Sequence, residues 1–368
     1  MSADAVHPDL PVRLTPSGTK PHTSVVRLDH QWYVACTSQE LTRRPLARVI
    51  GGVPLVVFRA AGGEPGALLD RCAHRNVPLS GGKIVGLHLQ CPYHGWEFDA
   101  DGRCRVVPGL CRDLDADRGR RVPAFAAREQ DGLVWVYATP DVEPIRPPFR
   151  FPRLDRPGYV VIRRKVVARG TLHATLENAL DVPHTAFLHG GLFRTAKRRN
   201  EIEAIVRRFG DRAEVEYIGE PRPSGLVGRL LSPSGGVVTH LDRFFLPSIA
   251  QVDYRLGDRN HFLVTSACTP VSDFETHIYA VIQLRLRVPA RLVKPLLEPI
   301  AKRIFAQDAE ILGQQTDVIR AFGGERFQST ELDLIGPHIY HLLKRAQRGE
   351  VGPGDGPAEY DKSIRLLV

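Results

Sequence analysis

The chain has 368 residues, of which 43% are hydrophobic and 25% are charged, with 33 glycines and 29 prolines. These proportions are ordinary for a globular protein and exclude collagen, low-complexity disorder and an isolated coiled coil. The net charge of +9 comes mostly from scattered arginines, and its densest groups, Arg118–Arg121 and Lys197–Arg199, are not interleaved with aromatics, so we expect no nucleic-acid partner.

From about residue 30 to residue 140, short β-rich runs alternate with glycine and proline. The runs are Val53–Phe58, Ala67–Asp70, Leu87–Gln90 and Leu133–Tyr137. This spacing predicts a small all-β domain. The six prolines between Pro140 and Pro157 fit an extended linker, so we expect one domain over residues 1–155 and a second over 156–368.

The second half mixes strands and helices, which predicts an α+β domain. We expect a strand over Tyr159–Val167, a helix over Thr171–Val182 and several strands over residues 201–288. Phe262–Thr269 and Thr276–Val288 are expected to pair. A helix over Pro299–Phe322 follows, and Gly323 and Gly324 close it.

Two cysteines and two histidines form the most specific motif in the chain. Cys72-Ala-His74 is followed after 16 residues by Cys91-Pro-Tyr-His94. Each pair comes just after an expected strand, where a tight loop can point two ligands at one place, and Gly81, Gly82 and Gly95 allow close backbone approach. A structural zinc site is the simpler interpretation. A Rieske [2Fe–2S] centre fits better, because each half supplies one Cys and one His.

A second group of residues indicates another metal. Asp181 and His184 are three residues apart and would share a helical face, and His189 follows five residues later. Both histidines can reach one metal only if the helix is interrupted, and Pro183 is placed to do so. Two unrelated histidines on a polar helix face are the alternative.

The helix expected over Pro299–Phe322 supplies a carboxylate. An apolar stripe on it is expected to be buried, and Asp308 lies on that stripe, whereas Glu310 and Asp317 lie on the opposite face. The stripe comprises Ile300, Ile304, Ile311, Leu312, Val318, Ile319 and Phe322. A buried carboxylate needs a cation, which is either an arginine or a metal shared with His184 and His189. Two histidines and one carboxylate form the facial triad of non-haem Fe(II) oxygenases.

The cluster motif, N-x-x-D-x-x-H-x₄-H from Asn178 to His189 and the late Phe305-Ala-Gln-Asp308 together resemble the α-subunit of Rieske non-haem iron oxygenases. The branch it resembles has only α-subunits and includes vanillate demethylase, ketosteroid hydroxylase and cholesterol-desaturase-like enzymes. The resemblance spans about residues 30–325. It implies an N-terminal Rieske domain and a C-terminal helix-grip-like antiparallel sheet with helices that carry a mononuclear iron.

The resemblance also implies residue roles and partners. Cys72, His74, Cys91 and His94 would hold the cluster, and His184, His189 and Asp308 would hold Fe(II). Asp181 and Asn178 receive catalytic roles, with Asp181 linking His184 to His94 of a neighbouring subunit in a homotrimer. Electrons would come from NAD(P)H through a separate ferredoxin or flavin reductase.

The expected function is therefore a monooxygenase that uses O₂ to hydroxylate or oxidatively demethylate its substrate. A Rieske electron-transfer or redox-sensing protein without a catalytic iron is the alternative, and a zinc hydrolase on His184 and His189 is a weaker one. Apolar runs such as Val227–Leu231 and Phe244–Ile249 favour a hydrophobic substrate, which is polycyclic, sterol-like or aromatic.

Three remaining features receive simpler interpretations. No apolar run approaches the ~18 residues of a membrane span and the first residues lack a signal-peptide core, so we expect a cytoplasmic protein. The basic stretch Arg291–Lys302 is interpreted as a solvated helix face, with membrane contact as the alternative. The other four cysteines are assigned no role beyond packing; they are Cys36, Cys104, Cys111 and Cys268.

Overall fold

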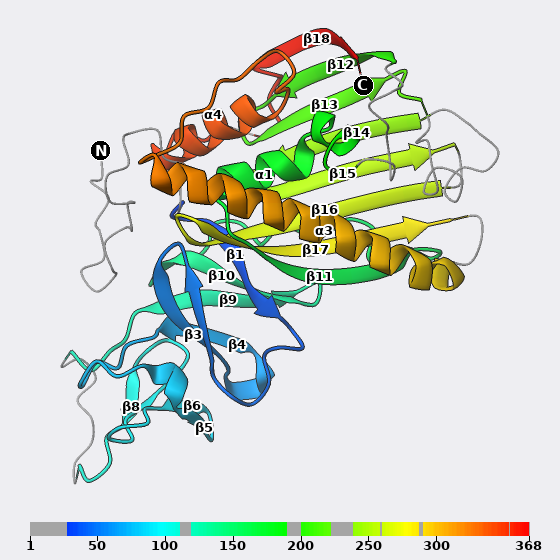
Figure 1. Cartoon of the computed structure of the whole chain (residues 1–368). Helices are drawn as coiled ribbons and strands as arrows, with labels where there is room; N and C mark the ends of the chain where they lie inside the picture. Colours follow the sequence, from blue (N-terminus) through cyan, green and yellow to red (C-terminus); the bar gives the residue numbers. More distant parts are fainter. Residues whose placement is uncertain are drawn as a thin grey trace. The chain divides into compact units, whose positions relative to one another are not determined.

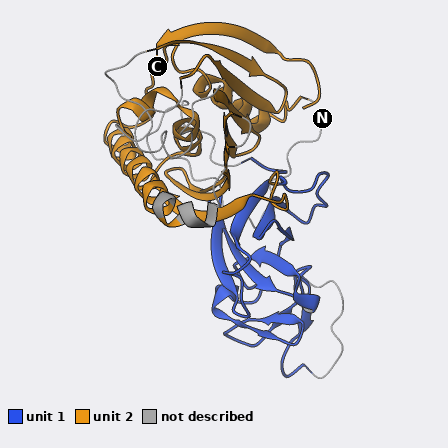
Figure 2. Cartoon of the chain, turned by 90° about the vertical axis from the view of Figure 1, so that its right-hand side faces the viewer, with its two compact units in different colours: residues 1–14, 27–150 blue, residues 15–26, 151–368 orange. Residues whose placement is uncertain are grey.

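The computed structural model describes residues 28–110, 119–189, 200–221, 238–257, 260–286, 290–352 and 354–367. These residues fall into two compact units, one that ends at Arg150 and one that begins at Phe151, shown in blue and orange in Figure 2. The division lies inside the expected linker, five residues before the expected boundary. Cys111 and the run Val227–Leu231 lie outside the described residues.

The first unit is all-β, as its alternation of β-rich runs and turn residues predicts. A six-stranded antiparallel sheet has the order β1-β10-β9-β4-β3-β2, and a four-stranded sheet has the order β5-β6-β7-β8. The strands are β1 (Trp32–Thr37), β2 (Leu46–Ile50), β3 (Val53–Arg59), β4 (Pro65–Leu69), β5 (Lys83–Val85), β6 (His88–Gln90), β7 (Glu97–Phe98), β8 (Cys104–Val106), β9 (Ala124–Gln130) and β10 (Leu133–Pro140).

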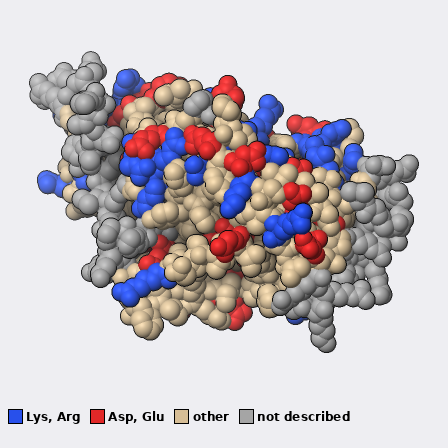
Figure 3. Space-filling model, turned by 90° about the horizontal axis from the view of Figure 1, so that it is seen from above, with Lys and Arg blue, Asp and Glu red and all other residues tan. Residues whose placement is uncertain are grey.

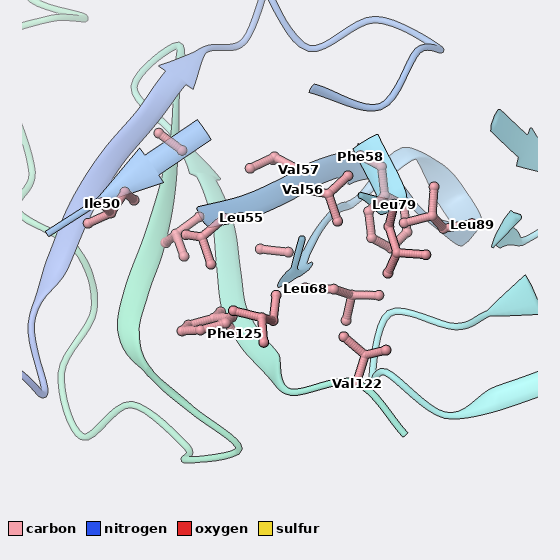
Figure 4. Close-up of a cluster of buried hydrophobic side chains, with 14 of the residues drawn as sticks. Ile50, Leu55, Val56, Val57, Phe58, Leu68, Leu79, Leu89, Val122 and Phe125 are labelled. Carbon is pink, nitrogen blue, oxygen red and sulfur yellow. The ribbon is translucent and has the colours of Figure 1, made fainter. Parts of the chain in front are cut away.

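The core of this unit is formed mainly by the six-stranded sheet and reaches the cluster motif. Figure 4 shows Val56 and Phe58 of β3 with Leu79 and Leu89 from the loop and strand next to the motif. Cys72 and Cys91 belong to the same buried group, with 1% and 3% of their surface exposed. The hydrophobic core therefore fixes the start of each half of the motif.

The second unit is built on an eight-stranded antiparallel sheet with the order β11-β17-β16-β15-β14-β13-β12-β18 (Figure 1). Of the expected partners, Phe262–Thr269 in β16 pairs with His277–Leu284 in β17, and residues 287–288 lie outside the described residues. The strands are β11 (Val160–Ala168), β12 (Glu201–Arg208), β13 (Arg212–Ile218), β14 (Val238–Phe245), β15 (Ile249–Leu256), β16 (Asn260–Ser272), β17 (Glu275–Arg285) and β18 (Tyr360–Leu367).

Helices α1 (Leu172–Leu180), α3 (Ala290–Ala321) and α4 (Gly336–Gln347) pack on the sheet, and Figure 1 shows α1 and α3 lying across it. The Thr171 side chain caps α1 by accepting a hydrogen bond of 3.1 Å from the Ala174 amide. The helix ends at Leu180, so Asp181 has an extended backbone and, contrary to expectation, does not share a helical face with His184. A 3₁₀ turn over Pro183–Ala186 follows, because Pro183 cannot continue the α-helical hydrogen bonds.

Helix α3 begins nine residues before the expected start and includes Pro295 and Pro299. Its expected buried stripe is partly wrong: Ile311, Val318 and Phe322 are 40%, 57% and 76% exposed. The face toward the sheet instead runs through residues such as Ala301 and Phe305, which pack against β11, β16 and β17. The stripe was misplaced because both edges of this helix carry apolar residues, so periodicity alone does not orient it.

Lys and Arg alternate with Asp and Glu on the face in Figure 3. Arg121 pairs with Asp141 at 2.5 Å, whereas Arg118 and Lys197–Arg199 lie outside the described residues. None of the helices in the described part of the chain is both long and apolar enough to cross a membrane. Arg291–Lys302 falls in the first turns of α3, where half of the side chains lie outside the description.

Candidate metal centres

The two halves of the Cys–His motif lie on loops in the first unit. Cys72 and His74 follow β4, and Cys91 and His94 follow β6. In the first loop the Asn76 amide donates to the Cys72 carbonyl at 2.9 Å, and in the second the Gly95 amide donates to the Cys91 carbonyl at 3.2 Å. Gly95 has a φ of +71°, which glycine adopts without strain. Each loop therefore turns its Cys and His back toward the same region.

The four side chains gather there. The rings of His74 and His94 have centroids 4.6 Å apart, and His74 stacks on Trp96 at an interplanar angle of 3°. Cys72 and Cys91 are both buried and free, and the Cys91 thiol helps to raise the pKa of the Cys72 thiol. The structure thus brings together all four residues predicted to hold the cluster.

This arrangement fits a group that binds thiolates and imidazoles. Burial raises the pKa of the Cys72 thiol to about 11, so its thiolate needs a cation beside it. The buried Nδ1 of His74 has no hydrogen-bond partner among the described residues. A ring nitrogen in that state is suited to bind iron. The buried thiols of the two cysteines, next to the imidazoles of His74 and His94, therefore fit a [2Fe–2S] cluster.

The second set of predicted ligands meets in the second unit. His184 lies in the 3₁₀ turn and His189 follows it, whereas Asp308 is in the middle of α3. Their ligand atoms all lie within 4.8 Å of one another. The two Nε2 atoms are 3.3 Å apart, and Asp308 Oδ1 is 3.1 Å from that of His189 and 3.7 Å from that of His184. The interruption at Pro183 lets both histidines face one point, as expected.

The outer nitrogen of each histidine is held by an acceptor. The Nδ1–H of His184 donates to Asp181 Oδ2 at 3.2 Å, and the Nδ1–H of His189 donates to Gln307 Oε1 at 3.1 Å. The Gln307 amide is held in turn, because its Nε2 donates to the Leu188 carbonyl at 3.1 Å. These bonds leave both Nε2 lone pairs turned inward, as in metal-binding histidines.

The point between His184, His189 and Asp308 is suited to a positive charge. Asp308 Oδ1 is buried, and no hydrogen bond of acceptable geometry reaches it from the described residues. Burial alone would lower the pKa of His189, but Asp308 and the bond to Gln307 outweigh it and raise that pKa. Two inward lone pairs and one unsatisfied carboxylate oxygen fit a divalent metal, and no arginine takes that place in the described structure.

A cavity of about 260 Å³ adjoins the triad, with walls from α1, α3 and the inner face of the sheet. Most of its lining is apolar, and Asn178 and Asp181 also border it. The apolar run Phe244–Ile249 is not among the described residues that line this cavity, and Phe244 is fully buried. Cys268 lines the cavity, where burial raises the pKa of its thiol to about 12.

Sequence reasoning missed two features of this region. Gln307 precedes a predicted ligand, and its position next to Asp308 was the only available signal. Glu220, His240 and Asp242 form a buried polar group in the cavity wall. His240 and Asp242 are two residues apart in a strand and so share a face, which the alternation of β14 could have shown.

Two known families match parts of the chain. Residues 31–125 match the family of the Rieske [2Fe-2S] domain, and residues 169–339 match that of the vanillate O-demethylase oxygenase C-terminal domain. The first match contains the four Cys and His residues of the first unit. The second contains the triad of the second unit.

Two of the relatives are named as oxygenase components. The chain is 36% identical over 180 residues to dicamba O-demethylase of Stenotrophomonas maltophilia, a match that covers 48% of this chain and 52% of that protein. It is 27% identical over 357 residues to chloroacetanilide N-alkylformylase of Rhizorhabdus wittichii, covering 88% and 95%. The match to chlorophyllide a oxygenase of Chlamydomonas reinhardtii spans only 24% of that relative.

Solved structures share the fold. Dicamba monooxygenase bound to dicamba superposes with a TM-score of 0.73 at 23% identity, covering 89% of this chain and 99% of that one. Pseudomonas putida NdmA with caffeine also has a TM-score of 0.73, at 22% identity, covering 91% and 98%. With its Rieske domain, its vanillate-demethylase-type C-terminal domain and these relatives, the chain belongs to the Rieske non-haem iron oxygenases, which hold a [2Fe–2S] cluster and a mononuclear iron.

Proposed function

We propose that this chain is the oxygenase component of a system that uses O₂ and externally supplied electrons to hydroxylate or oxidatively demethylate an aromatic substrate. The observation that carries this proposal is the triad of His184, His189 and Asp308, which adjoins an apolar cavity within its own unit. An electron carrier has no need of three inward ligand atoms beside a cavity. The arrangement therefore favours catalysis over the electron-transfer alternative.

The protein's residues divide the work between two metal groups. When bound, the cluster would supply electrons and the single iron would activate O₂. Cys72, His74, Cys91 and His94 would hold the cluster. His184, His189 and Asp308 would hold the single iron and, as three ligands, leave coordination positions open toward the cavity.

Neighbouring side chains orient the ligands. Asp181 fixes the ring of His184 through Nδ1 and also accepts a bond of 3.3 Å from the His184 amide. Gln307 fixes the ring of His189. We assign Asp181 a further role in passing electrons from the cluster of a neighbouring subunit, and Asn178 a role at the cavity wall beside it. This assignment requires the homotrimer that the family resemblance implies.

The substrate is proposed to be a compact aromatic compound. Three of the relatives' names refer to dicamba, methylxanthine and chloroacetanilide, and none of these is a sterol. The cavity of about 260 Å³ is smaller than the ~300–1,000 Å³ of typical ligand pockets, which favours one or two rings over a steroid skeleton. The sterol-like part of the expectation therefore finds no support.

A metal and turnover experiment tests the proposal. The full chain is reconstituted anaerobically with iron and sulfide, and iron and zinc are measured. Aromatic methyl ethers and N-methyl compounds are then supplied with NADH and a ferredoxin and flavin reductase, and formaldehyde release is followed. We expect about three irons per chain and O₂-dependent formaldehyde. About two irons without turnover would favour the electron carrier, and zinc alone would refute both.

A further inference from the structure

The two metal centres hold their histidines in different ways. In the triad, Asp181 accepts a hydrogen bond from His184, and Gln307 accepts one from His189. The ring of His74 makes no hydrogen bond of this kind to any described residue, and its buried Nδ1 is without a partner among them. Contacts between rings must therefore orient this predicted ligand of the cluster.

A flat aromatic contact takes the place of that hydrogen bond. The rings of His74 and Trp96 have centroids 4.6 Å apart and an interplanar angle of 3°. This is the geometry of an offset stack, which aromatic rings prefer over a face-to-face sandwich. The ring of His94 meets that of His74 at 62°, with centroids also 4.6 Å apart. Trp96 thus covers one flat face of His74, whereas His94 meets it edge-on.

Trp96 is itself held in place by the core of the first unit. Its carbonyl accepts a hydrogen bond of 2.8 Å from the Cys91 amide, across the turn that contains Gly95. Its side chain is partly buried against the hydrophobic core, and its ring centroid lies 6.5 Å from that of the fully buried Phe98. Because the backbone and the core both fix the indole, the indole can in turn fix the ring of His74.

An indole in this position affects a cluster held by His74 in two ways. Reduction adds one electron, which comes from the external reductase and converts one of the two ferric ions to ferrous, so the cluster becomes one charge more negative. The face of an aromatic ring has a negative electrostatic potential, which opposes added negative charge. The ring also keeps water from one face of His74, and solvent exposure is one of the factors that set cluster potentials. Both effects lower the reduction potential.

The aromatic neighbour of the other histidine is placed differently. The ring centroid of Tyr93 lies 3.8 Å from that of His94, but the rings are tilted by 40° and Tyr93 is 62% exposed. An exposed ring excludes little water, and the surrounding water screens its electrostatic potential. Tyr93 therefore provides a comparison within the same loop, because it contacts a predicted cluster ligand without covering it.

We propose that Trp96 is a positioning residue that fixes the imidazole of His74 by stacking and keeps the reduction potential of the cluster low. The inference requires the cluster, and it does not depend on the substrate or on the reaction proposed above. A role of Trp96 in packing alone makes a different prediction, because the potential would then not respond to the loss of the flat ring. The potential therefore distinguishes the two roles.

A redox titration of the full chain tests this role. Each protein is reconstituted anaerobically with iron and sulfide and titrated with dithionite and mediators, while circular dichroism in the visible range follows the cluster. In Trp96→Leu we expect the equilibrium constant for reduction to rise about tenfold, a shift of about 59 mV for one electron. Sulfide should also be lost to a chelator about tenfold faster, because the ring of His74 is freer to turn.

Two further variants identify the stack as the cause. Trp96→Phe keeps a flat ring and should restore both properties to within about twofold of the unaltered chain. Tyr93→Leu is the matched control, because it removes an aromatic contact to the other histidine, and it should change neither property by more than about twofold. An unchanged potential in Trp96→Leu, or an equal rise in Tyr93→Leu, would overturn the proposal.

A chemical change to the indole tests the electrostatic effect without a substitution. Growth on 5-fluorotryptophan replaces all three tryptophans of the chain and withdraws electron density from their faces, with almost no change of shape. We expect the equilibrium constant for reduction to rise about twofold, which is about 18 mV. The same label should have no effect in Trp96→Phe, and equal potentials of the labelled and unlabelled unaltered chain would overturn the proposal. This comparison decides the question even if Trp96→Leu takes up no cluster.

The outcomes for this residue and for the oxygenase remain distinct. A cluster whose potential responds to Trp96, without formaldehyde release, would refute the proposed function and leave the role of Trp96. Turnover with a potential that does not respond would do the reverse. An unaltered chain that takes up no cluster would refute both.

Discussion

The cluster residues and the triad residues reach their places by different routes. The four cluster residues lie between positions 72 and 94, on two loops that short backbone hydrogen bonds fold. The triad joins His189 to Asp308 across most of the second unit, and it exists only because α3 packs on the sheet. A local site depends on turn geometry, whereas a distributed site depends on the whole fold. Loss of metal should therefore have different consequences in the two units.

The largest expected effect is loss of the cluster in Cys91→Ala. The remaining thiolate cannot hold the cluster, so iron should fall from about three to about one per chain, with all acid-labile sulfide lost. The triad should keep its iron, because no residue of the first unit belongs to it. Cys104→Ala is the control, since Cys104 is a half-exposed free thiol in β8. Loss of all three irons in Cys91→Ala would contradict the independence of the two sites.

Asp308→Ala should produce the opposite result. It removes the carboxylate from the triad, so we expect about two irons per chain, an unchanged cluster spectrum and no turnover. Glu310→Ala, two residues away on the exposed side of α3, should keep three irons. Iron analysis together with visible absorbance measures both results. If iron is retained in Asp308→Ala and lost in Glu310→Ala, Glu310 rather than Asp308 is the iron ligand.

These two sites also differ in how far the sequence predicts them. The Cys–His motif needs only spacing, because its loops are local, and the family match over residues 31–125 agrees with it. Asp308 could be proposed because a carboxylate on an apolar helix stripe requires a cation. The same stripe was misplaced at Ile311, Val318 and Phe322, although Leu312 and Ile319 are buried as expected. Apolar residues lie on both edges of α3, so periodicity alone does not say which edge packs on the sheet.

Residues that act through tertiary contacts could not be predicted from the sequence. Glu220 reaches His240 from beyond the end of β13, and no spacing rule links a loop residue to a strand 20 positions later. Gln307 reaches His189 from another element 118 positions away. Such contacts depend on how α3 and the sheet are placed, which the sequence pattern does not specify.

A smaller effect is expected when Gln307 is changed to Leu. The Nδ1 of His189 then loses its acceptor, so the ring can turn and the affinity of the triad for Fe(II) should fall by about tenfold. Competition with a chelator, read by iron content, measures this without turnover. Gln307→Glu should restore most of the affinity because it keeps an acceptor in place. Gln314→Leu, an exposed position on the same helix, should have no effect, and a similar loss there would contradict the positioning role.

The smallest expected effect concerns Asp273, a buried carboxyl group of the second unit. Unlike Asp308, it does not belong to a group of potential metal ligands among the described residues. Burial, with a contribution from Glu325, raises the pKa of Asp273 to about 6, and its Oδ1 has no hydrogen-bond partner among the described residues. Because the folded state favours the neutral acid, its contribution to stability is complete below the ordinary aspartate pKa of 3.8 and is lost as pH rises through about 6. Asp273→Asn should therefore raise the thermal unfolding midpoint at pH 8 by about 2 °C or more and change it little at pH 4.

Asp317→Asn is the control, because it removes an exposed carboxylate paired with Arg169 and should change the unfolding midpoint little at either pH. Equal stabilisation by Asp273→Asn at pH 4 and pH 8 would show that ionisation is not the cause, and the contrast with Asp308 would then lie in packing rather than in charge.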